Sequence, residues 1–138
     1  MDMTAITDLD VLLRDMRPDL RPAEYVYCTV AAEEAGDWLS LSPLGFFRED
    51  EGITLILERT VADSAGLAYG PVLRCITLTV HSALEAVGLT AAVAAALTRH
   101  GISANVIAAY YHDHIFVPAG DADRAVEALR RLSAASRS

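Results

Sequence analysis

The chain has 138 residues, of which 53% are hydrophobic and 22% charged, so it can build one compact domain or two small ones and is too apolar to be disordered. Its 19 acidic residues outnumber 11 basic ones, which gives a net charge of −8. Because nucleic acids and anionic membranes attract basic surfaces, this balance argues against both as partners.

The sequence lacks features of membrane-spanning, secreted or disulfide-bonded proteins. The longest apolar run, residues 89–97, is mostly alanine and too short to span a bilayer. The first ten residues are acidic and lack the basic start of a signal peptide. Cys28 and Cys75 each lie in a strand-like run outside any CxxC pattern, so we expect buried structural thiols. Together these features predict a cytoplasmic protein.

The chain opens with a short amphipathic helix and a strand. Thr7 or Asp8 is expected to cap the helix, and Pro18 to stop it. The aromatic and β-branched run 24–30 predicts a strand, and the segment that follows it, 31–38, reads as an acidic loop.

A β-hairpin and a second short helix complete the first half. The apolar segments 46–47 and 53–57 flank an acidic turn, a pattern typical of a hairpin. Residues 60–67 predict a helix that Thr60 caps and Gly66 ends.

The second half has clearer periodicity. Residues 72–80 alternate as a strand, and the following helix is expected to have Thr90 as its cap and Gly101 just beyond its end. The segments 102–111 and 114–118 predict two strands, and Asp121 should cap the last helix. We therefore expect an α+β chain of two related units.

The stretch 110–117, YYHDHIFV, carries the most conspicuous titratable residues. If His112 and His114 lie in one strand, they share a face and, with His81, could hold a zinc ion. Asp113 with His112 or His81 could form an acid–base dyad, but no nucleophile motif, phosphate loop or dinucleotide fingerprint accompanies it. A hairpin tip without chemistry is the plainer interpretation.

The loop 82–90 offers another kind of site. It joins a strand to a helix, and the free backbone amides of a helix N-terminus can bind a carboxylate. The structural alternative is that Gly88 only relieves strain and Thr90 only caps the helix.

Residues 76–118, with VGLTA, HGIS and YYHDHIFV, resemble an ACT domain, and the whole chain resembles short free-standing tandem ACT-like proteins related to the paired ACT modules of aspartate kinases and arginine sensors. The resemblance implies two ferredoxin-like βαββαβ units with antiparallel sheets and helices on one face. It divides the chain into a degenerate unit at 1–71 and an ACT domain at 72–138. No strand follows the last helix, so the other half of the chain or a partner must complete that sheet.

The resemblance also implies an amino-acid site. The ligand carboxylate would lie on the 82–90 loop and its amine on Asp113 with His112 beside it, while its side chain would reach towards residues 106–108. The implied site residues are Ser82, Ala83, Leu84, Val87, Gly88, Leu89, Thr90, Val106, Ile107, Ala108, His112 and Asp113.

The function that follows is a non-enzymatic regulatory protein that binds a small molecule, with no cofactor, no metal and no catalytic residue. We expect a homodimer that passes its signal to a protein partner in trans. Two alternatives stay open. One is an interaction module that has lost its ligand, and the other is a metal-dependent enzyme that uses the His112 and His114 pair.

Overall fold

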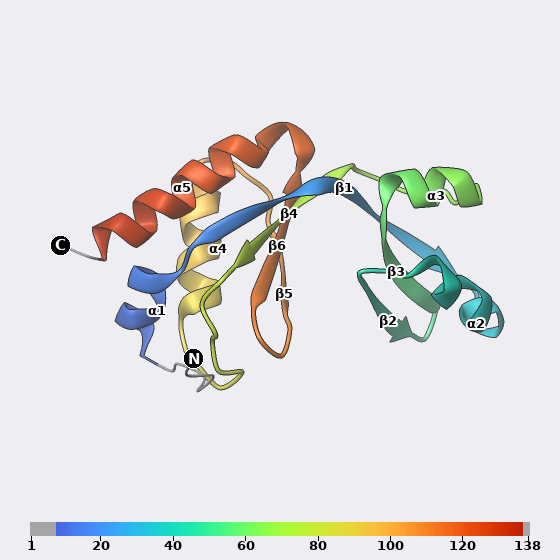
Figure 1. Ribbon diagram of the computed structural model, residues 1–138, viewed down its shortest axis with the longest axis horizontal. Helices are drawn as coiled ribbons and strands as arrows, with labels where there is room; N and C mark the ends of the chain where they lie inside the picture. The colour runs from blue at the N-terminus through green and yellow to red at the C-terminus, as the bar shows by residue number, and fades with distance from the viewer. Residues whose placement is uncertain (1–7, 137–138) are drawn as a thin grey trace. The chain divides into compact units, whose positions relative to one another are not determined.

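The computed structural model describes residues 8–136 (Figure 1). Its strands are β1 (Pro18–Val30), β2 (Gly45–Glu49), β3 (Gly52–Glu58), β4 (Leu73–Leu78), β5 (Asn105–Ala108) and β6 (Asp113–Pro118). Its α-helices are α1 (Leu9–Asp15), α2 (Ala35–Trp38), α3 (Arg59–Ala65), α4 (Leu89–Arg99) and α5 (Ala122–Ala135). Three 3₁₀ turns complete the elements: η1 (Ala32–Glu34), η2 (Leu39–Leu41) and η3 (Ala119–Asp121). None of the helices in this range is both long and apolar enough to cross a bilayer.

The six strands hydrogen-bond in the order β2-β3-β1-β4-β6-β5, and the expected mixed α/β architecture with an antiparallel sheet is confirmed. The chain forms two compact units. The inserted unit is Ala23–Leu73, and the outer unit combines the described parts of 1–22 and 74–138. Residues 8–22 thus belong to the same unit as the second half of the chain. The division of the sequence into two ACT-like units between residues 71 and 72 stays a prediction.

The outer unit acquires its missing strand from the start of β1. The backbone N–H of Thr79 donates to Arg17 O at 3.2 Å, and the Arg74 guanidinium donates to Arg21 O at 2.7 Å. The unit's strand order is therefore β1-β4-β6-β5, with β1 in the position that a strand after α5 would occupy. Of the two expected alternatives, the other half of the chain or a partner, the structure thus shows the first.

A single core joins the helices of the outer unit to one face of its sheet (Figure 1). Alternate residues of β4 and β6 face α1, α4 and α5, as the period of two in a strand requires. The fully buried members of this core, each no more than 1% exposed, are Leu12, Met16, Ile76, Leu78, Val93, Leu97, Ile115, Val117, Ala125 and Leu129.

The inserted unit has its own small core. The antiparallel pairs Cys28–Leu55 and Val30–Ile53 place alternate residues of β1 and β3 on one face. The β2–β3 hairpin is confirmed, with Glu49 opposite Gly52. Cys28 and Cys75 are both buried free thiols, as expected, and burial raises the pKa of each.

Helix ends agree with the sequence only in part. Asp8 caps α1 by accepting from the N–H of Asp10 at 2.9 Å, whereas Thr7 lies outside the described residues. Gly66 and Gly101 follow their helices with positive φ, as predicted.

Three helix starts differ from expectation. Thr60 is not the cap of α3, because that helix already starts at Arg59 after Glu58. Thr90 is not the cap of α4, because Gly88 precedes its first residue, Leu89. Asp121 is at the N-cap of α5 but makes no capping bond, since its carboxylate accepts from Arg124. The segment 31–38, expected to be a loop, forms η1 and α2.

Candidate functional site

The N-terminus of α4 forms one side of the candidate site. The chain leaves β4, makes a turn in which Ala86 N–H donates to Ala83 O, and enters the helix through Gly88 at a φ of 101°. Among residues 8–136, no side chain caps α4. The first backbone N–H groups of the helix therefore keep their capacity to donate to an anion, with the positive end of the helix dipole behind them.

Asp113 supplies a negative charge on the other side of the candidate site. It opens β6 opposite Ala108 of β5, and it faces the helices because it alternates in phase with Ile115 and Val117. Only 8% of Asp113 is exposed. Burial raises the pKa of this carboxyl group, while the nearby His114 and His112 act in the opposite direction. Among residues 8–136, no group donates a hydrogen bond to its carboxylate.

These elements enclose a cavity of about 100 Å³. Its walls are the loop after β4, the first residues of α4 and the adjoining ends of β5 and β6. The lining residues are Ser82, Ala83, Leu84, Ala86, Gly88, Leu89, Thr90, Ala108 and Asp113. A helix N-terminus and a carboxylate on one small cavity can bind the two ends of a zwitterion, the anion at the amides and the cation at Asp113.

Eight of the twelve residues that the sequence assigned to the site line this cavity. The other four do not. Val87 is 81% exposed, Val106 packs against the core, and Ile107 pairs with His114 on the strand next to it. His112 lies outside the lining, with its Nδ1 3.3 Å from Val80 O.

Ala86 lines the cavity although the sequence did not single it out. An alanine has no polar group that could mark it as a site residue, and only the closed turn between Ala83 and Ala86 gives it this place. The side chain contributes shape alone.

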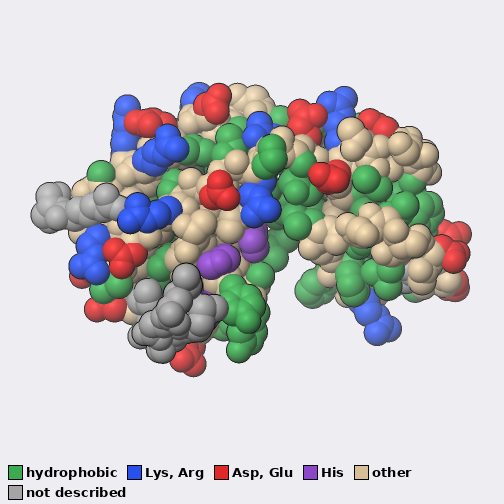
Figure 2. All heavy atoms as spheres, viewed as in Figure 1, with side chains coloured by type: hydrophobic (Ala, Val, Ile, Leu, Met, Phe, Trp, Pro, Cys, Tyr) green, Lys and Arg blue, Asp and Glu red, His purple; other side chains and the backbone are tan. Residues whose placement is uncertain are grey.

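The histidines do not assemble a metal site. Histidine side chains gather in one patch in Figure 2, next to acidic and basic groups. His114 Nδ1 lies 2.9 Å from Thr77 Oγ1, and the buried His81 Nδ1 has no hydrogen-bond partner among the described residues. Across residues 8–136, however, no three His, Cys, Asp or Glu side chains are placed to share an ion.

Comparisons with known proteins agree with this fold. Two family models, both described as ACT domain, match residues 4–74 and 72–131. A crystal structure of a Vibrio cholerae protein of unknown function, described as a possible transport protein, is 54% identical and has a TM-score of 0.82. The match covers 91% of this chain and 95% of that one.

More distant structures share the fold at low identity. A protein from Agrobacterium tumefaciens is 18% identical, with a TM-score of 0.70 over 86% of this chain and 89% of its own. The ligand-free regulatory subunit of aspartate kinase from Thermus thermophilus is 8% identical, with a TM-score of 0.65 over 86% and 97%. Among curated proteins, none matches the chain.

Proposed function

Because the chain belongs to the ACT-domain family, we propose that it is a non-enzymatic regulatory protein that binds a free amino acid in the cavity between α4 and Asp113. ACT domains generally bind small molecules, which supports a ligand here. The observation that carries the proposal is the buried Asp113 carboxylate, which faces a cavity together with an uncapped helix N-terminus.

The amino acid would bind by its α-carboxylate and α-ammonium groups. The carboxylate would accept from backbone N–H groups at the start of α4, and the ammonium group would form an ion pair with Asp113. An ammonium partner offsets the desolvation of Asp113, so each charge makes the other less costly to bury. The net charge of −8 favours a neutral or cationic amino acid over an acidic one.

The small size of the cavity is an argument for a homodimer. At about 100 Å³ it is smaller than the 300 Å³ or more that is typical of small-molecule sites, so the ligand side chain would extend beyond it. Leu84 and Val87 in the same loop are 70% and 81% exposed, and Tyr110 before β6 is 73% exposed. We propose that a second copy covers these apolar residues and completes the site, as a cytoplasmic homodimer that signals to a partner in trans.

A thermal-shift screen of the twenty amino acids tests the proposal. A ligand at a hundred times its Kd stabilises the fold by about 2.7 kcal/mol, which shifts Tm by several degrees. We expect one amino acid or a small group to do so, and Asp113→Asn to abolish the shift. Asp50→Asn is the matched control, since Asp50 is an exposed turn residue of the inserted unit.

The same small cavity and apolar rim also favour a second candidate, an interaction module without a ligand. That function predicts no stabilisation by any amino acid, together with a dimer whose dissociation constant rises on Leu84→Glu. If no amino acid raises the Tm at millimolar concentration, the sensor function is refuted and the interaction module is left. If an amino acid still raises the Tm of the Asp113→Asn variant, the proposed binding site is wrong but the sensor function is not.

A further inference from the structure

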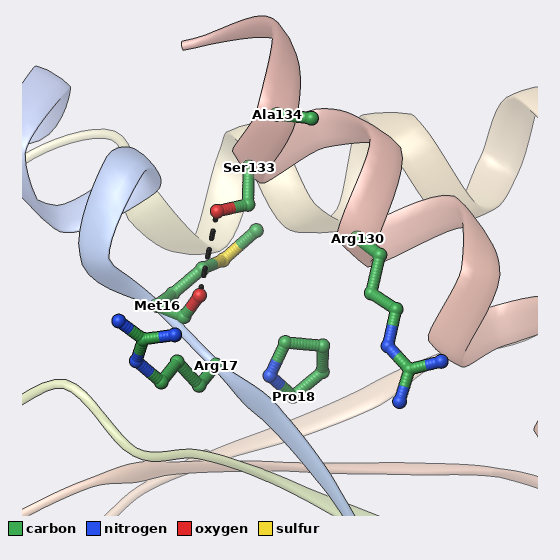
Figure 3. Close-up of a pocket in the computed structure, with 6 residues that line it drawn as sticks. All are labelled: Met16, Arg17, Pro18, Arg130, Ser133 and Ala134. Atoms are coloured by element: carbon green, nitrogen blue, oxygen red, sulfur yellow. Dashed lines mark hydrogen bonds between the residues drawn. The ribbon is translucent and has the colours of Figure 1, made fainter. Parts of the chain in front are cut away.

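A second cavity of the outer unit lies apart from the amino-acid site. It has a volume of about 290 Å³ and is formed where the end of α1 and the start of β1 meet the last turns of α5. Its lining residues are Met16, Arg17, Pro18, Arg130, Ser133 and Ala134 (Figure 3). None of them lines the cavity that contains Asp113.

The charged groups on this cavity are both cationic. Arg17 comes from the segment between α1 and β1, and Arg130 from α5, and Figure 3 shows them on either side of Pro18. No acidic side chain lines the cavity, although acidic residues outnumber basic ones by 19 to 11 in the chain. Two guanidinium groups at one hollow give it a local positive potential within an acidic protein.

These two arginines also differ from their neighbours in having no carboxylate partner in the part of the chain that the structure describes. Arg131, the next residue of α5, pairs with Glu127 at 3.1 Å, and Arg124 pairs with Asp121 at 2.9 Å. Within residues 8–136, the Arg17 and Arg130 side chains form neither an ion pair nor a hydrogen bond. Their donor groups are therefore available to a ligand.

Ser133 holds the two sides of the cavity together. Its hydroxyl lies 3.1 Å from Arg14 O and 3.4 Å from Met16 O, so it ties α5 to the end of α1, and Figure 3 shows the second of these contacts. The backbones that carry Arg17 and Arg130 are thus fixed relative to each other before any ligand binds, which lowers the entropic cost of binding between them.

We propose that Arg17 and Arg130 form a binding site for the phosphate group of a small phosphorylated metabolite. A phosphate monoester carries a charge of about −1.5 to −2 at pH 7 and three acceptor oxygens, which suits two guanidinium groups that approach from different elements. A single carboxylate has one charge and two oxygens, which one arginine already satisfies. Met16, Pro18 and Ala134 supply apolar surface for the carbon part of the metabolite.

Titration of the full chain with inorganic phosphate and with glycerol 3-phosphate, at constant ionic strength, tests this site. The readout is the NMR chemical shift of the arginine Nε–H groups. We expect saturable shifts for Arg17 and Arg130, with the ester binding at least as well as free phosphate. Arg17→Gln and Arg130→Gln should each weaken binding by roughly tenfold, because each removes charge-assisted hydrogen bonds.

Arg131→Gln is the matched control, because it removes the same charge from the same helix at a residue outside the cavity. It should keep the affinity of the unmodified protein within about twofold. Shifts that do not saturate, or an Arg131→Gln variant that loses as much affinity as Arg130→Gln, would overturn the proposal. Acetate that binds as tightly as phosphate would overturn the assignment to a phosphate group.

Discussion

Leu9 and Gly88 lie so close that a Cβ atom on Gly88 would be 2.9 Å from Leu9 Cδ2. The contact joins α1 to the residue that precedes α4. Gly88 also has a φ of 101°, a conformation that residues with a side chain rarely adopt. The glycine therefore serves two needs at the edge of the proposed ligand cavity, one of backbone conformation and one of space.

Replacement of this glycine should be costly mainly through the backbone. We expect Gly88→Ala to lower the free energy of unfolding by about 1–3 kcal/mol, the usual cost of such a conformation. The Leu9 methyl group is the end of a flexible side chain and can move away. The cost of Gly88→Ala, measured by urea denaturation, should thus be nearly the same in a Leu9→Ala background.

Gly120 provides the control for this substitution. Its added Cβ would meet nothing within 4 Å, and Gly120→Ala should change stability by less than about 0.5 kcal/mol. If Leu9→Ala removes most of the cost of Gly88→Ala, the steric contact dominates and the backbone argument is wrong.

Asp113 should destabilise the ligand-free protein at neutral pH. Its folded-state pKa is raised, so between the unfolded value and the folded value the folded state binds more protons. The stability that the protonated Asp113 gives the folded state is therefore complete below the unfolded pKa of about 3.9. It is lost as the pH rises through the folded pKa and the buried carboxyl group ionises. We expect Asp113→Asn to raise the Tm of the ligand-free protein at pH 7, while it removes the response to an amino acid.

The two effects of Asp113→Asn separate a binding residue from a structural one. A carboxylate that mainly supports the fold would lower Tm when replaced, as loss of a buried partner does. Differential scanning fluorimetry at pH 7 and pH 4 measures both states. A gain in Tm that persists unchanged at pH 4 would show that its source is packing rather than the charge of Asp113.

His114 should act in the opposite pH direction. Its pKa is lowered, first by burial of the ring and then by the charges of His112 and Arg21, with Asp113 opposing them. Between the lowered folded value and the unfolded value near 6.5, the unfolded state binds more protons. Stability should therefore fall as pH drops through 6.5, and be fully retained above it.

His114→Gln measures this contribution. The variant keeps a polar group near Thr77 Oγ1, which lies 2.9 Å from His114 Nδ1, but cannot take up the proton. We expect the difference in unfolding free energy between pH 7.5 and pH 5.5 to be smaller in the variant than in the unmodified chain. Equal losses in both proteins would assign the acid sensitivity to other groups.

Local sequence patterns predicted the elements better than their ends. Alternation and turn residues located β2, β3, β4 and β6, because those signals lie within a few residues of each other. Thr60 and Thr90 were wrong as caps because α3 begins at Arg59 and α4 at Leu89. In α4 the first residue, Leu89, is only 3% exposed, so its packing outweighed the preference of threonine for the cap.

Contacts between distant parts of the chain were harder to predict from the sequence. The other half of the chain or a partner was expected to complete the outer sheet, but no local pattern identified the start of β1 as the strand that does so. The placement of Arg17 and Arg130 on one cavity likewise depends on how α1 and α5 pack. By contrast, the loop 82–90 stood out in the sequence as a glycine-containing helix start, whereas the binding role of Asp113 came only from the resemblance to ACT domains and stays a prediction.

Ser133 should contribute to stability through its link between α5 and α1. It is 5% exposed, and its hydroxyl lies within hydrogen-bond distance of Arg14 O and Met16 O. Ser133→Ala removes this donor from a buried position without adding bulk. We expect it to lower the free energy of unfolding by about 1–2 kcal/mol in urea denaturation, with the m-value unchanged.

Ser136→Ala separates that link from a general effect of serine on the helix. Ser136 follows α5, and its hydroxyl donates to Leu132 O at 3.3 Å, a contact within the same turn that ties no other element to α5. Its replacement should cost less than about 0.5 kcal/mol. If both variants lose the same amount, the connection between α5 and α1 does not depend on Ser133, and the fixed geometry inferred for the Arg17 and Arg130 cavity loses its support.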